Sequence, residues 1–488
     1  MSEPTPDPRL LAARFPARMR WSAATSSFQI EGARTGDGRG RSIWDTQVDV
    51  PGWVKDGSTA EPGPDSYHRF GDDIALLREL GVDRYRFSLS WVRIQPDGTG
   101  PAETRGLDYY DRLVDGLLDA GITPFPTLYH WDHPQWLEDA GGWLTRDMAD
   151  RFADYTGIVA GRLGDRVQHW YTINEPVSMS LQGYGLGTLA PARQLLFGAL
   201  ATVHHQLLAH GRAVQALRAA GGAEIGIPNN HTLVRPLHPD DGAAVATYDL
   251  LHNRIFADPL LSGAYPDLEA FGLPPMPVRG DDMAVISEPL DFYGVNFYNP
   301  TTVTRATEPG PLPFEIVPTP GAPVTGFGPE WPIEPPALRE LLIDFRERYG
   351  DGLPPSSSAR TAPRSPSPTS RPECRTTTAS PTSPVTSPPS PTPWTRASTS
   401  ANTRCGRCWT TSSGPTASRS ASGSSTSTSA RPSAHPRHPS TGTARSSERH
   451  THDVSPHDQG RSALVPAVHA RVAGDLDGPA HAGATAAA

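Results

Sequence analysis

Apolar residues recur with helical and strand-like spacing along the first 350 residues of the chain. One set repeats at steps of three, one, three and one, which is one face of an α-helix: Tyr110, Leu113, Val114, Leu117 and Leu118. Gly121 follows as a helix C-cap residue would. The apolar run at residues 122–129 then predicts a buried strand directly after that helix.

The same alternation of helix and strand extends over residues 19–353. Further helices are predicted at residues 72–80, 152–163, 200–219, 249–256 and 336–349, and further strands at residues 82–89, 169–173, 225–227 and 292–295. This α/β alternation predicts a parallel sheet, and a (β/α)8 TIM barrel in particular, because polar residues follow the strands where barrel enzymes carry their chemistry. A doubly wound sheet is less favoured, since no glycine-rich phosphate turn follows a first strand. The Pro/Gly-rich residues 308–336 are predicted as a loop over one end.

The composition changes sharply after Pro355. Residues 354–488 contain 14 Arg, no Lys and 6 acidic residues, a net charge of +8, and they are rich in Ser, Thr and Pro. They show no apolar period, so they are predicted to be disordered. We therefore divide the chain into an N-terminal extension (1–18), most of a barrel (19–353) and a low-complexity tail (354–488). As written, the barrel is incomplete because this tail replaces its last strands.

The charge balance of residues 1–353 excludes some classes of partner. Of the 43 basic and 52 acidic residues in the chain, 29 and 46 lie there, a net charge of −17. This balance argues against nucleic acid and anionic membranes as partners. The three cysteines, Cys374, Cys405 and Cys408, all lie in the tail, and the N-terminus shows no signal peptide. No apolar run approaches the ~20 residues of a membrane span. These features predict a cytoplasmic protein.

Six segments carry a resemblance to a known family: MRWSAATSSFQIEGA (19–33), SIWD (42–45), YRFSLSW (85–91), LYHWD (128–132), NEP (174–176) and DFYGVNFY (291–298). In order and spacing they closely resemble the signature segments of glycoside hydrolase family 1, the β-glucosidases. The resemblance covers residues 19–353, about seven tenths of the chain. It implies a TIM barrel that hydrolyses terminal β-D-glucosyl, or more broadly β-glycosyl, residues of small-molecule glycosides. Val92, where proline is usual, and His133, where leucine is usual, depart from the pattern at the rim of the site.

Glu175 is the candidate general acid/base. Retaining glycoside hydrolysis needs two carboxylates on opposite faces of the scissile bond, one of which holds a proton near neutral pH. Glu175 follows Asn174 at a predicted strand end, and Pro176 fixes the turn after it. Taken alone, such a residue is more often a surface glutamate that caps a helix. The other five segments favour the catalytic role.

The resemblance assigns roles to seven further residues: Gln29, Arg86, His130, Trp131, Asn174, Asn296 and Tyr298. The asparagine before the acid/base resembles the residue that binds the sugar 2-hydroxyl, and the glutamine and histidine resemble those that bind the 3- and 4-hydroxyls. The tryptophan offers an aromatic face, with core packing as its alternative. Arg86, Asn296 and Tyr298 would support the nucleophile. The alternative for Arg86 is a role as an ion-pair partner in the core. A structural role is the alternative for the histidine. No metal or organic cofactor is implied.

The family's nucleophile is missing. In the family it is a glutamate in an Ile/Val-Thr-Glu-Asn-Gly segment, and a later Trp-Ser-Leu-Leu-Asp-Asn-Phe-Glu-Trp stretch binds the sugar. Neither segment is present, and neither tail glutamate, Glu373 or Glu448, precedes Asn-Gly. Glu175 therefore lacks the nucleophile that the family mechanism pairs with it.

The tail conceals both segments in another reading frame. The chain has one lysine, Lys55, against a large excess of Arg, Ala, Gly and Pro, which indicates a GC-rich gene. With GC-rich codons read from their third base, residues 404–415 can give Val-Trp-Ser-Leu-Leu-Asp-Asn-Phe-Glu-Trp-Ala. The same offset at residues 356–363 can give Val-Ile-(Ser or Gly)-Glu-Asn-Gly-Ala, with the glutamate straddling Ala359 and Arg360. We interpret this as a one-base frameshift near residue 355, by mutation or sequencing error, and we expect the truncated barrel to fold poorly.

Two other functions stay open. One is a 6-phospho-β-glycosidase. It is disfavoured because the hidden segment has a glutamate after its Phe, which can bind an unphosphorylated 4- or 6-hydroxyl, whereas a phosphate would need Ser and Lys there. The other is a non-catalytic sugar-binding pseudoenzyme with a disordered basic tail. Against it stands the hidden content of the tail, since a selected tail would not conceal half a glycosidase.

Overall fold

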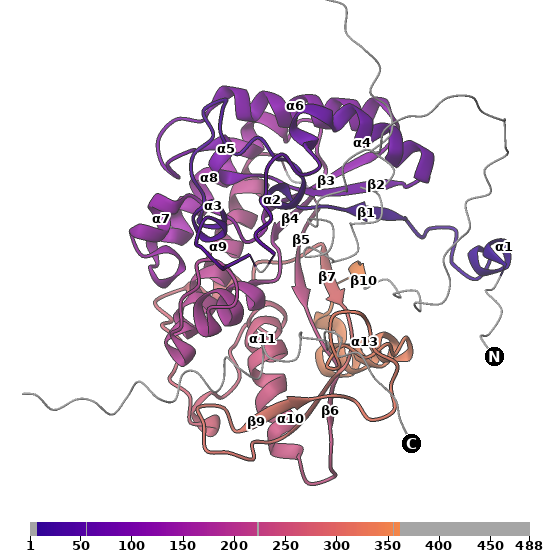
Figure 1. Ribbon diagram of the computed structural model, residues 1–488, viewed down its shortest axis with the longest axis vertical. Coiled ribbons are helices and arrows are strands. Elements are labelled where there is room, and N and C mark those ends of the chain that lie inside the picture. Colours follow the sequence, from indigo (N-terminus) through magenta and orange to yellow (C-terminus); the bar gives the residue numbers. More distant parts are fainter. Residues whose placement is uncertain (1–6, 55, 222–223, 355, 362–488) are drawn as a thin grey trace, which may run out of the picture. The chain divides into compact units, whose positions relative to one another are not determined.

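Seven parallel strands form one curled sheet at the centre of the described chain (Figure 1). The computed structural model describes residues 7–54, 56–221, 224–354 and 356–361, the last of these segments by its backbone alone. Each strand pairs in parallel with its neighbour. In spatial order the strands are β1 (Ser22–Ala24), β2 (Arg84–Ser88), β3 (Thr123–Tyr129), β4 (His169–Ile173), β5 (Glu224–Asn230), β7 (Phe292–Phe297) and β10 (Ser356–Thr361).

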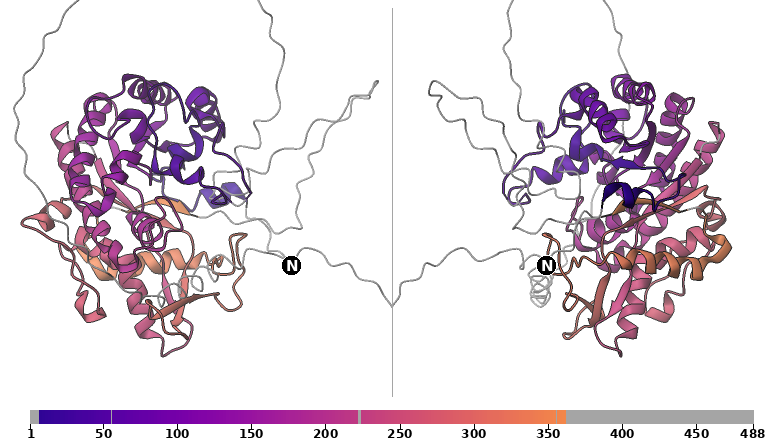
Figure 2. Two further views of the ribbon diagram at one scale, coloured as in Figure 1. Left: turned by 60° about the vertical axis from the view of Figure 1, so that its left-hand side comes forward. Right: turned by 90° about the vertical axis from the view of Figure 1, so that its right-hand side faces the viewer.

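The spatial order of the strands equals their order along the chain. A doubly wound sheet reverses its strand order at a switch point, whereas a barrel adds each strand beside the one before it. The predicted parallel α/β barrel architecture is therefore confirmed, in the form of a partial barrel. Helices cover its outer side (Figure 2). The longer ones are α4 (Ser66–Leu80), α6 (Thr104–Asp119), α8 (Asp147–Leu163), α9 (Leu200–Ala219), α10 (Gly242–Asp249), α11 (Ile255–Leu261) and α13 (Pro336–Tyr349).

Shorter helices precede the first strand or lie in the connections between these units. They are α1 (Pro8–Ala12), α2 (Ser27–Ile30), α3 (Ile43–Val48), α5 (Trp91–Ile94), α7 (Gln135–Asp139), α12 (Asp282–Ile286) and two π-helices, Ser178–Leu186 and Leu250–Arg254. The second π-helix corrects one expectation, because the helix predicted at residues 249–256 is divided by it between α10 and α11. A π-turn inserts an extra residue into the helical period, so apolar spacing alone does not reveal it. None of the helices in the described residues is long and apolar enough to cross a membrane.

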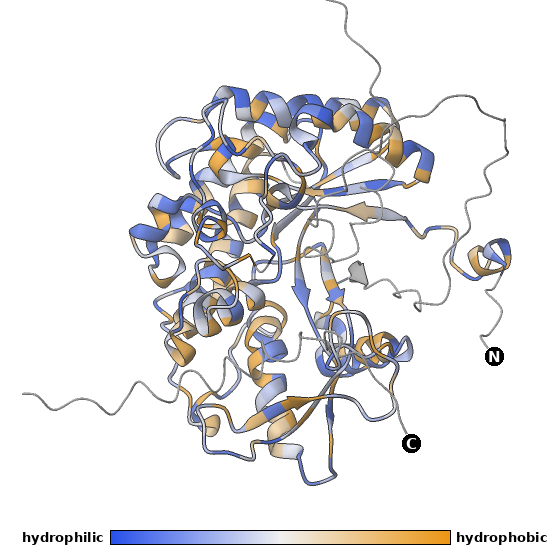
Figure 3. Ribbon diagram, viewed as in Figure 1, coloured by the Kyte–Doolittle hydropathy of each residue, from blue (hydrophilic) through white to orange (hydrophobic). Residues whose placement is uncertain are grey.

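Helix α6 shows how the apolar period positions these outer helices. Leu113 and Leu117 are buried against the sheet, and hydrophobic and hydrophilic residues alternate along the helix in Figure 3. Gly121 follows with a φ of +73°, in the left-handed region that a glycine ending a helix commonly adopts. Leu118, however, is 41% exposed, so its assignment to the buried face was wrong. It lies one residue beyond Leu117, which turns it about 100° away from the core.

A small second sheet lies beside α10 at the lower end of Figure 1. It consists of β6 (Val234–Pro236), β8 (Thr301–Arg305) and β9 (Phe314–Val317). Strand β9 corrects the prediction that residues 308–336 are all loop. It pairs antiparallel with β8, from Thr302 opposite Val317 to Arg305 opposite Phe314, and the phenylalanine is buried. The strand has only four residues, Phe-Glu-Ile-Val, so it is too short for a periodic signal to stand out from the surrounding Pro/Gly-rich segment.

The inside of the curled sheet is filled in layers. Phe125, Tyr171 and Phe292, from β3, β4 and β7, form a separate buried cluster in which the first two rings stack at 4.5 Å. The guanidinium of Arg86, on β2, lies 4.8 Å from the centre of the Tyr171 ring. This aromatic floor supports the arginine at the level where the strands end.

The sheet is open between its first and last strands. Within the described residues, β1 pairs with β2 alone and β10 pairs with β7 alone. Closure of an eight-stranded barrel would need one more strand between them. Strand β10 continues the sheet past residue 353, where we predicted that the barrel ends. The rest of the predicted tail, 362–488, and its expected disorder lie outside the described residues.

A buried ion pair ties the N-terminal segment to the barrel. Glu31 Oε2 accepts from Arg93 Nε at 3.0 Å, and Glu31 Oε1 accepts from the Tyr110 hydroxyl at 2.6 Å. The Arg93 and Glu31 side chains are 0% and 6% exposed. We expect Glu31→Ala to lower the free energy of unfolding by roughly 3–5 kcal/mol, because it leaves a buried guanidinium without its counter-charge.

Urea unfolding curves would test this expectation against a matched surface pair. The Asp240 carboxylate pairs with Arg305, and their side chains are 74% and 65% exposed. Asp240→Ala should therefore change the free energy of unfolding by less than about 1 kcal/mol. Equal losses in the two variants would contradict the prediction.

Candidate active site

Glu175 occupies a constrained position just after β4. Its side chain is 1% exposed, and its backbone has φ of +46°, in the left-handed region that few non-glycine residues adopt. Its backbone N–H donates to the carbonyl of Pro228 on β5 at 2.8 Å. This hydrogen bond to the neighbouring strand holds the strained turn, which directs the carboxylate toward the strand ends. Backbone strain of this kind gathers at functional sites.

Three donors converge on the Glu175 carboxylate. Oε1 accepts from the amide Nδ2 of Asn296 on β7 and from the hydroxyl of Tyr298 at 3.3 Å. Oε2 accepts from the hydroxyl of Ser178 at 2.9 Å. The same Asn296 amide donates to Asn174 Oδ1 at 3.1 Å. The carboxylate is thus fixed from both sides by residues of two different strand ends.

Asn174 connects Glu175 to the inner arginine and to the histidine after β3. Its Oδ1 accepts from Arg86 Nη2 at 2.5 Å, and its Nδ2 donates to His130 Nε2 at 3.2 Å. Arg86 Nε also donates to the hydroxyl of Thr127 at 3.0 Å. All four of these side chains are buried. Five of the predicted site residues, Arg86, His130, Asn174, Glu175 and Asn296, are therefore joined in one hydrogen-bonded cluster with Tyr298 at its border.

Trp131 flanks the same cluster. Its indole Nε1 donates to the backbone carbonyl of Asn174 at 2.8 Å, and its own carbonyl accepts from Trp44 Nε1 at 2.8 Å. It is half-buried and has φ of +65°. Two indole hydrogen bonds thus fix the loop after β3, with part of an aromatic surface left open beside the carboxylate.

Gln29 lies apart from this cluster. It is on the short helix α2 after β1, is exposed, and accepts from the Ser26 hydroxyl at 2.8 Å through Oε1. Among the described residues, no hydrogen bond joins Gln29 to the other predicted site residues. Ser178, by contrast, was not predicted. Its signal in the sequence is its spacing, three residues after Glu175 and one helical turn on, but serine at such spacing is common.

Strand β10 lies beside the cluster without a carboxylate of its own. Its residues are Ser-Ser-Ser-Ala-Arg-Thr, and Arg360 is the register partner of Asn296 on β7. The register shifts between Ser358 and Arg360. The backbone at residues 359 and 360 is therefore adjacent to the asparagine that contacts Glu175. Asn296 and Tyr298 were expected to support a nucleophile. In the structure both residues donate to the Glu175 carboxylate.

A second buried acid lies next to the site. Asp132 is 6% exposed, and burial, with the nearby charge of Asp45, raises its pKa to about 7. Asp45 itself binds the guanidinium groups of Arg34 and Arg39, at 2.7 and 2.5 Å. The two arginines lower the pKa of Asp45. For Asp132, the charge of Arg39 lowers the pKa by less than burial and Asp45 raise it. Two neighbouring carboxyl groups are in this way driven to different protonation states.

This arrangement predicts a pH-dependent stability. Between about pH 4 and pH 7, Asp132 is ionised in the unfolded chain and protonated in the folded chain. Its contribution to the free energy of unfolding therefore falls as the pH rises through this window, by about 1.4 kcal/mol per pH unit. Relative to Asp132→Asn, whose amide does not titrate, the unsubstituted chain should lose about 2 kcal/mol between pH 5 and pH 7. Parallel stability curves of the two proteins in urea would contradict this.

Comparison with known proteins identifies the family. The model of "Glycosyl hydrolase family 1" matches residues 11–355. The chain belongs to glycosyl hydrolase family 1. It is 42% identical over 350 residues to "Thermostable beta-glucosidase B" of Thermobispora bispora, covering 70% of this chain and 71% of that protein. It is 40% identical over 349 residues to "Beta-glucosidase" of an Agrobacterium strain, covering 70% and 76%. The family resemblance seen in the sequence is confirmed.

Solved structures agree with this family 1 assignment. The virulence factor SghA from Agrobacterium tumefaciens aligns with a TM-score of 0.69 at 39% identity, over 73% of this chain and 80% of that one. The family 1 β-glucosidase from Thermotoga maritima aligns with a TM-score of 0.66 at 37% identity, over 71% and 78%. The SghA protein has also been solved with its substrate analog salicin. The family 1 chain described here is thus a glycoside hydrolase by descent and by fold. Its described residues contain no group of three or more potential metal ligands.

Proposed function

We propose that this family 1 chain descends from a retaining β-glucosidase in which Glu175 is the general acid/base. In that mechanism Glu175 protonates the leaving oxygen while a second glutamate attacks the anomeric carbon, and Glu175 then activates the water that releases the sugar. The observation that carries this proposal is the position of Glu175, 1% exposed at the end of β4 and hydrogen-bonded to Asn296 and Tyr298. The β-glucosidase relatives support β-glucosides as its substrates.

The neighbouring residues have separate roles in this proposal. Asn174 binds the sugar 2-hydroxyl, Gln29 and His130 bind the 3- and 4-hydroxyls, and Trp131 provides the aromatic surface beside the ring. Arg86 supports this role of Asn174, because its guanidinium donates to the Oδ1 atom and so orients the amide. The exposure of Gln29 agrees with a residue that faces a sugar rather than the core.

We further propose that the chain as it stands is inactive, because a frameshift near residue 355 removed the nucleophile. The register of β10 supports this interpretation. The shifted frame has its glutamate across residues 359 and 360, and Arg360 is paired with Asn296, the residue that contacts Glu175. A nucleophile there would lie across from the acid/base. Sequencing the gene over the codons of residues 350–361 tests the frameshift, and an unaltered frame with full activity would disprove the inactivity.

Two assays separate this function from its rivals. Hydrolysis of nitrophenyl β-D-glucoside but not of its 6-phosphate by the frame-corrected protein would support the β-glucosidase, and the reverse preference would support a 6-phospho-β-glycosidase. Titration of the uncorrected chain with glucose addresses the pseudoenzyme. Saturable glucose binding without turnover in either frame would favour that alternative.

A further inference from the structure

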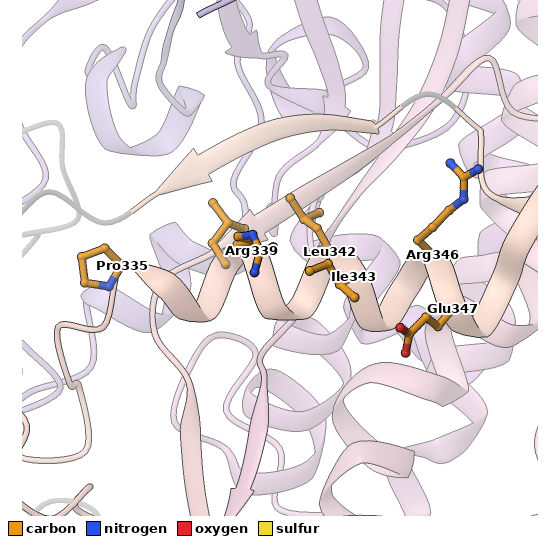
Figure 4. Close-up of a pocket in the computed structure, with 7 residues that line it drawn as sticks. Pro335, Arg339, Leu342, Ile343, Arg346 and Glu347 are labelled. Carbon is orange, nitrogen blue, oxygen red and sulfur yellow. The ribbon is translucent and has the colours of Figure 1, made fainter. Parts of the chain in front are cut away.

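Helix α13 carries a shallow groove on its outer face. The groove has a volume of about 630 Å³. It is lined by Pro335, Leu338, Arg339, Leu342, Ile343, Arg346 and Glu347 (Figure 4). Ile343 at its centre is 40% exposed, although the opposite side of the helix, with Leu341 and Phe345, is fully buried. Leu338 and Leu342 in the groove are partly buried against the core, so Ile343 is the apolar residue that the described chain leaves most exposed on this face.

The open edge of the sheet is formed by β10, the strand that follows α13. Strand β10 follows α13 in the chain and pairs on one side only within the described residues. A parallel strand is joined to the next by a right-handed crossover helix. The helix that follows β10 in a complete barrel would therefore pack beside α13, and the strand after it would enter the gap between β10 and β1. The helix face and the sheet edge are two independent surfaces that require the same occupant.

We propose that this chain binds in trans the C-terminal segment of a family 1 β-glucosidase, namely the helix after its seventh strand together with its eighth strand. The match of the family model ends at residue 355, and 29% of the Thermobispora bispora relative lies outside its match with this chain. Such a segment offers an apolar helix face to Leu338, Leu342 and Ile343. Its strand offers backbone N–H and C=O groups to two open edges at once.

The other possible occupants fit less well. Residues 362–488 contain 13 Arg, two Leu and neither Ile nor Phe, so they lack an apolar helix face. The groove has three charged lining residues, Arg339, Arg346 and Glu347, and so a net positive charge. A basic tail is therefore repelled. A second copy would bring the same two arginines against the groove, and two β10 edges related by a two-fold axis would pair antiparallel and leave the gap open.

The test is a binding experiment with the full chain. The probe is the segment of the Thermobispora bispora relative that begins after its seventh strand, titrated by calorimetry. We expect saturable one-to-one binding with a Kd in the micromolar range or tighter, and slowed amide hydrogen exchange in α13 and β1 but not in α6. Because the probe lacks a nucleophile, no hydrolysis is expected, and the outcome is independent of the catalytic proposal.

Two matched variants locate the binding surface. Ile343→Asp should weaken binding at least about tenfold, because it introduces a charge into the apolar groove. Leu118→Asp is the control, since Leu118 is 41% exposed on α6, which packs against α4, α5, α8 and β3. Absence of binding to the full chain, or equal weakening by both variants, would overturn the proposal.

Discussion

Translation of this gene with the frame restored at the codon of Ser356 should raise kcat/KM for nitrophenyl β-D-glucoside by at least about 10⁴-fold over the chain as it stands. The magnitude follows from the loss of a covalent nucleophile, which alone costs roughly 10⁴- to 10⁶-fold in enzymes that act through such a group. Restoration would supply a carboxylate beside Asn296, opposite Glu175. It would also supply the strand that closes the sheet between β10 and β1.

A third protein separates chemistry from folding in this experiment. In a frame-corrected chain whose restored glutamate codon is changed to glutamine, the barrel closes but the nucleophile is absent. We expect this protein to unfold cooperatively like the corrected chain and to hydrolyse no faster than about 10⁻⁴ of its rate. Should the uncorrected chain already hydrolyse the glucoside at the corrected rate, the frameshift would have no catalytic consequence and the assignment of the nucleophile would be wrong.

Glu175→Gln in the frame-corrected protein should lower kcat/KM for alkyl β-glucosides by roughly 10²- to 10⁴-fold. Glutamine fills the same space but has no proton to give to the departing oxygen. For 2,4-dinitrophenyl β-glucoside the loss in kcat/KM should be much smaller, because dinitrophenolate leaves without protonation. Its kcat should nevertheless fall, since Glu175 also activates the water in the second step.

This dependence on the leaving group identifies the acid/base specifically. A variant that only disturbs the fold would slow the two substrates equally. Glu269→Gln, at an exposed glutamate away from the site, should leave both rates unchanged. Equal losses for the alkyl and dinitrophenyl substrates in Glu175→Gln would show that Glu175 acts in another way.

Much of the barrel could be predicted from the sequence because its determinants are local. The bounds of α9, α13 and β4 agree with the apolar period, and the polar residues that follow buried strands meet at one edge of the sheet. Parallel strands require this, since their carboxyl ends lie at the same edge. The sequence therefore predicted that Glu175 lies close to Asn296, although the two are 121 residues apart.

The features that escaped prediction depend on distant partners. Strand β9 depends on its pairing with β8. The pKa of Asp132 is raised by burial and by the charge of Asp45, which lies 87 residues earlier and itself binds the nearby arginine Arg39. Ser178 donates to the Glu175 carboxylate, and Glu175 has a left-handed backbone that the sequence does not announce. Neither pairing, desolvation nor a positive φ at a non-glycine residue leaves a periodic trace in the chain.

The agreement of strand order with chain order has a consequence for synthesis. Every strand pairing in the described sheet joins neighbours that leave the ribosome one after the other, and only closure joins the first strand to the last. An intact relative passes through the open sheet while its final ~100 residues are made, which takes about 5–20 s at 5–20 residues per second. Under the proposed frameshift, the same intermediate has no successor in this chain. It would therefore present to chaperones and proteases, for its whole lifetime, a surface that its relatives show only during translation.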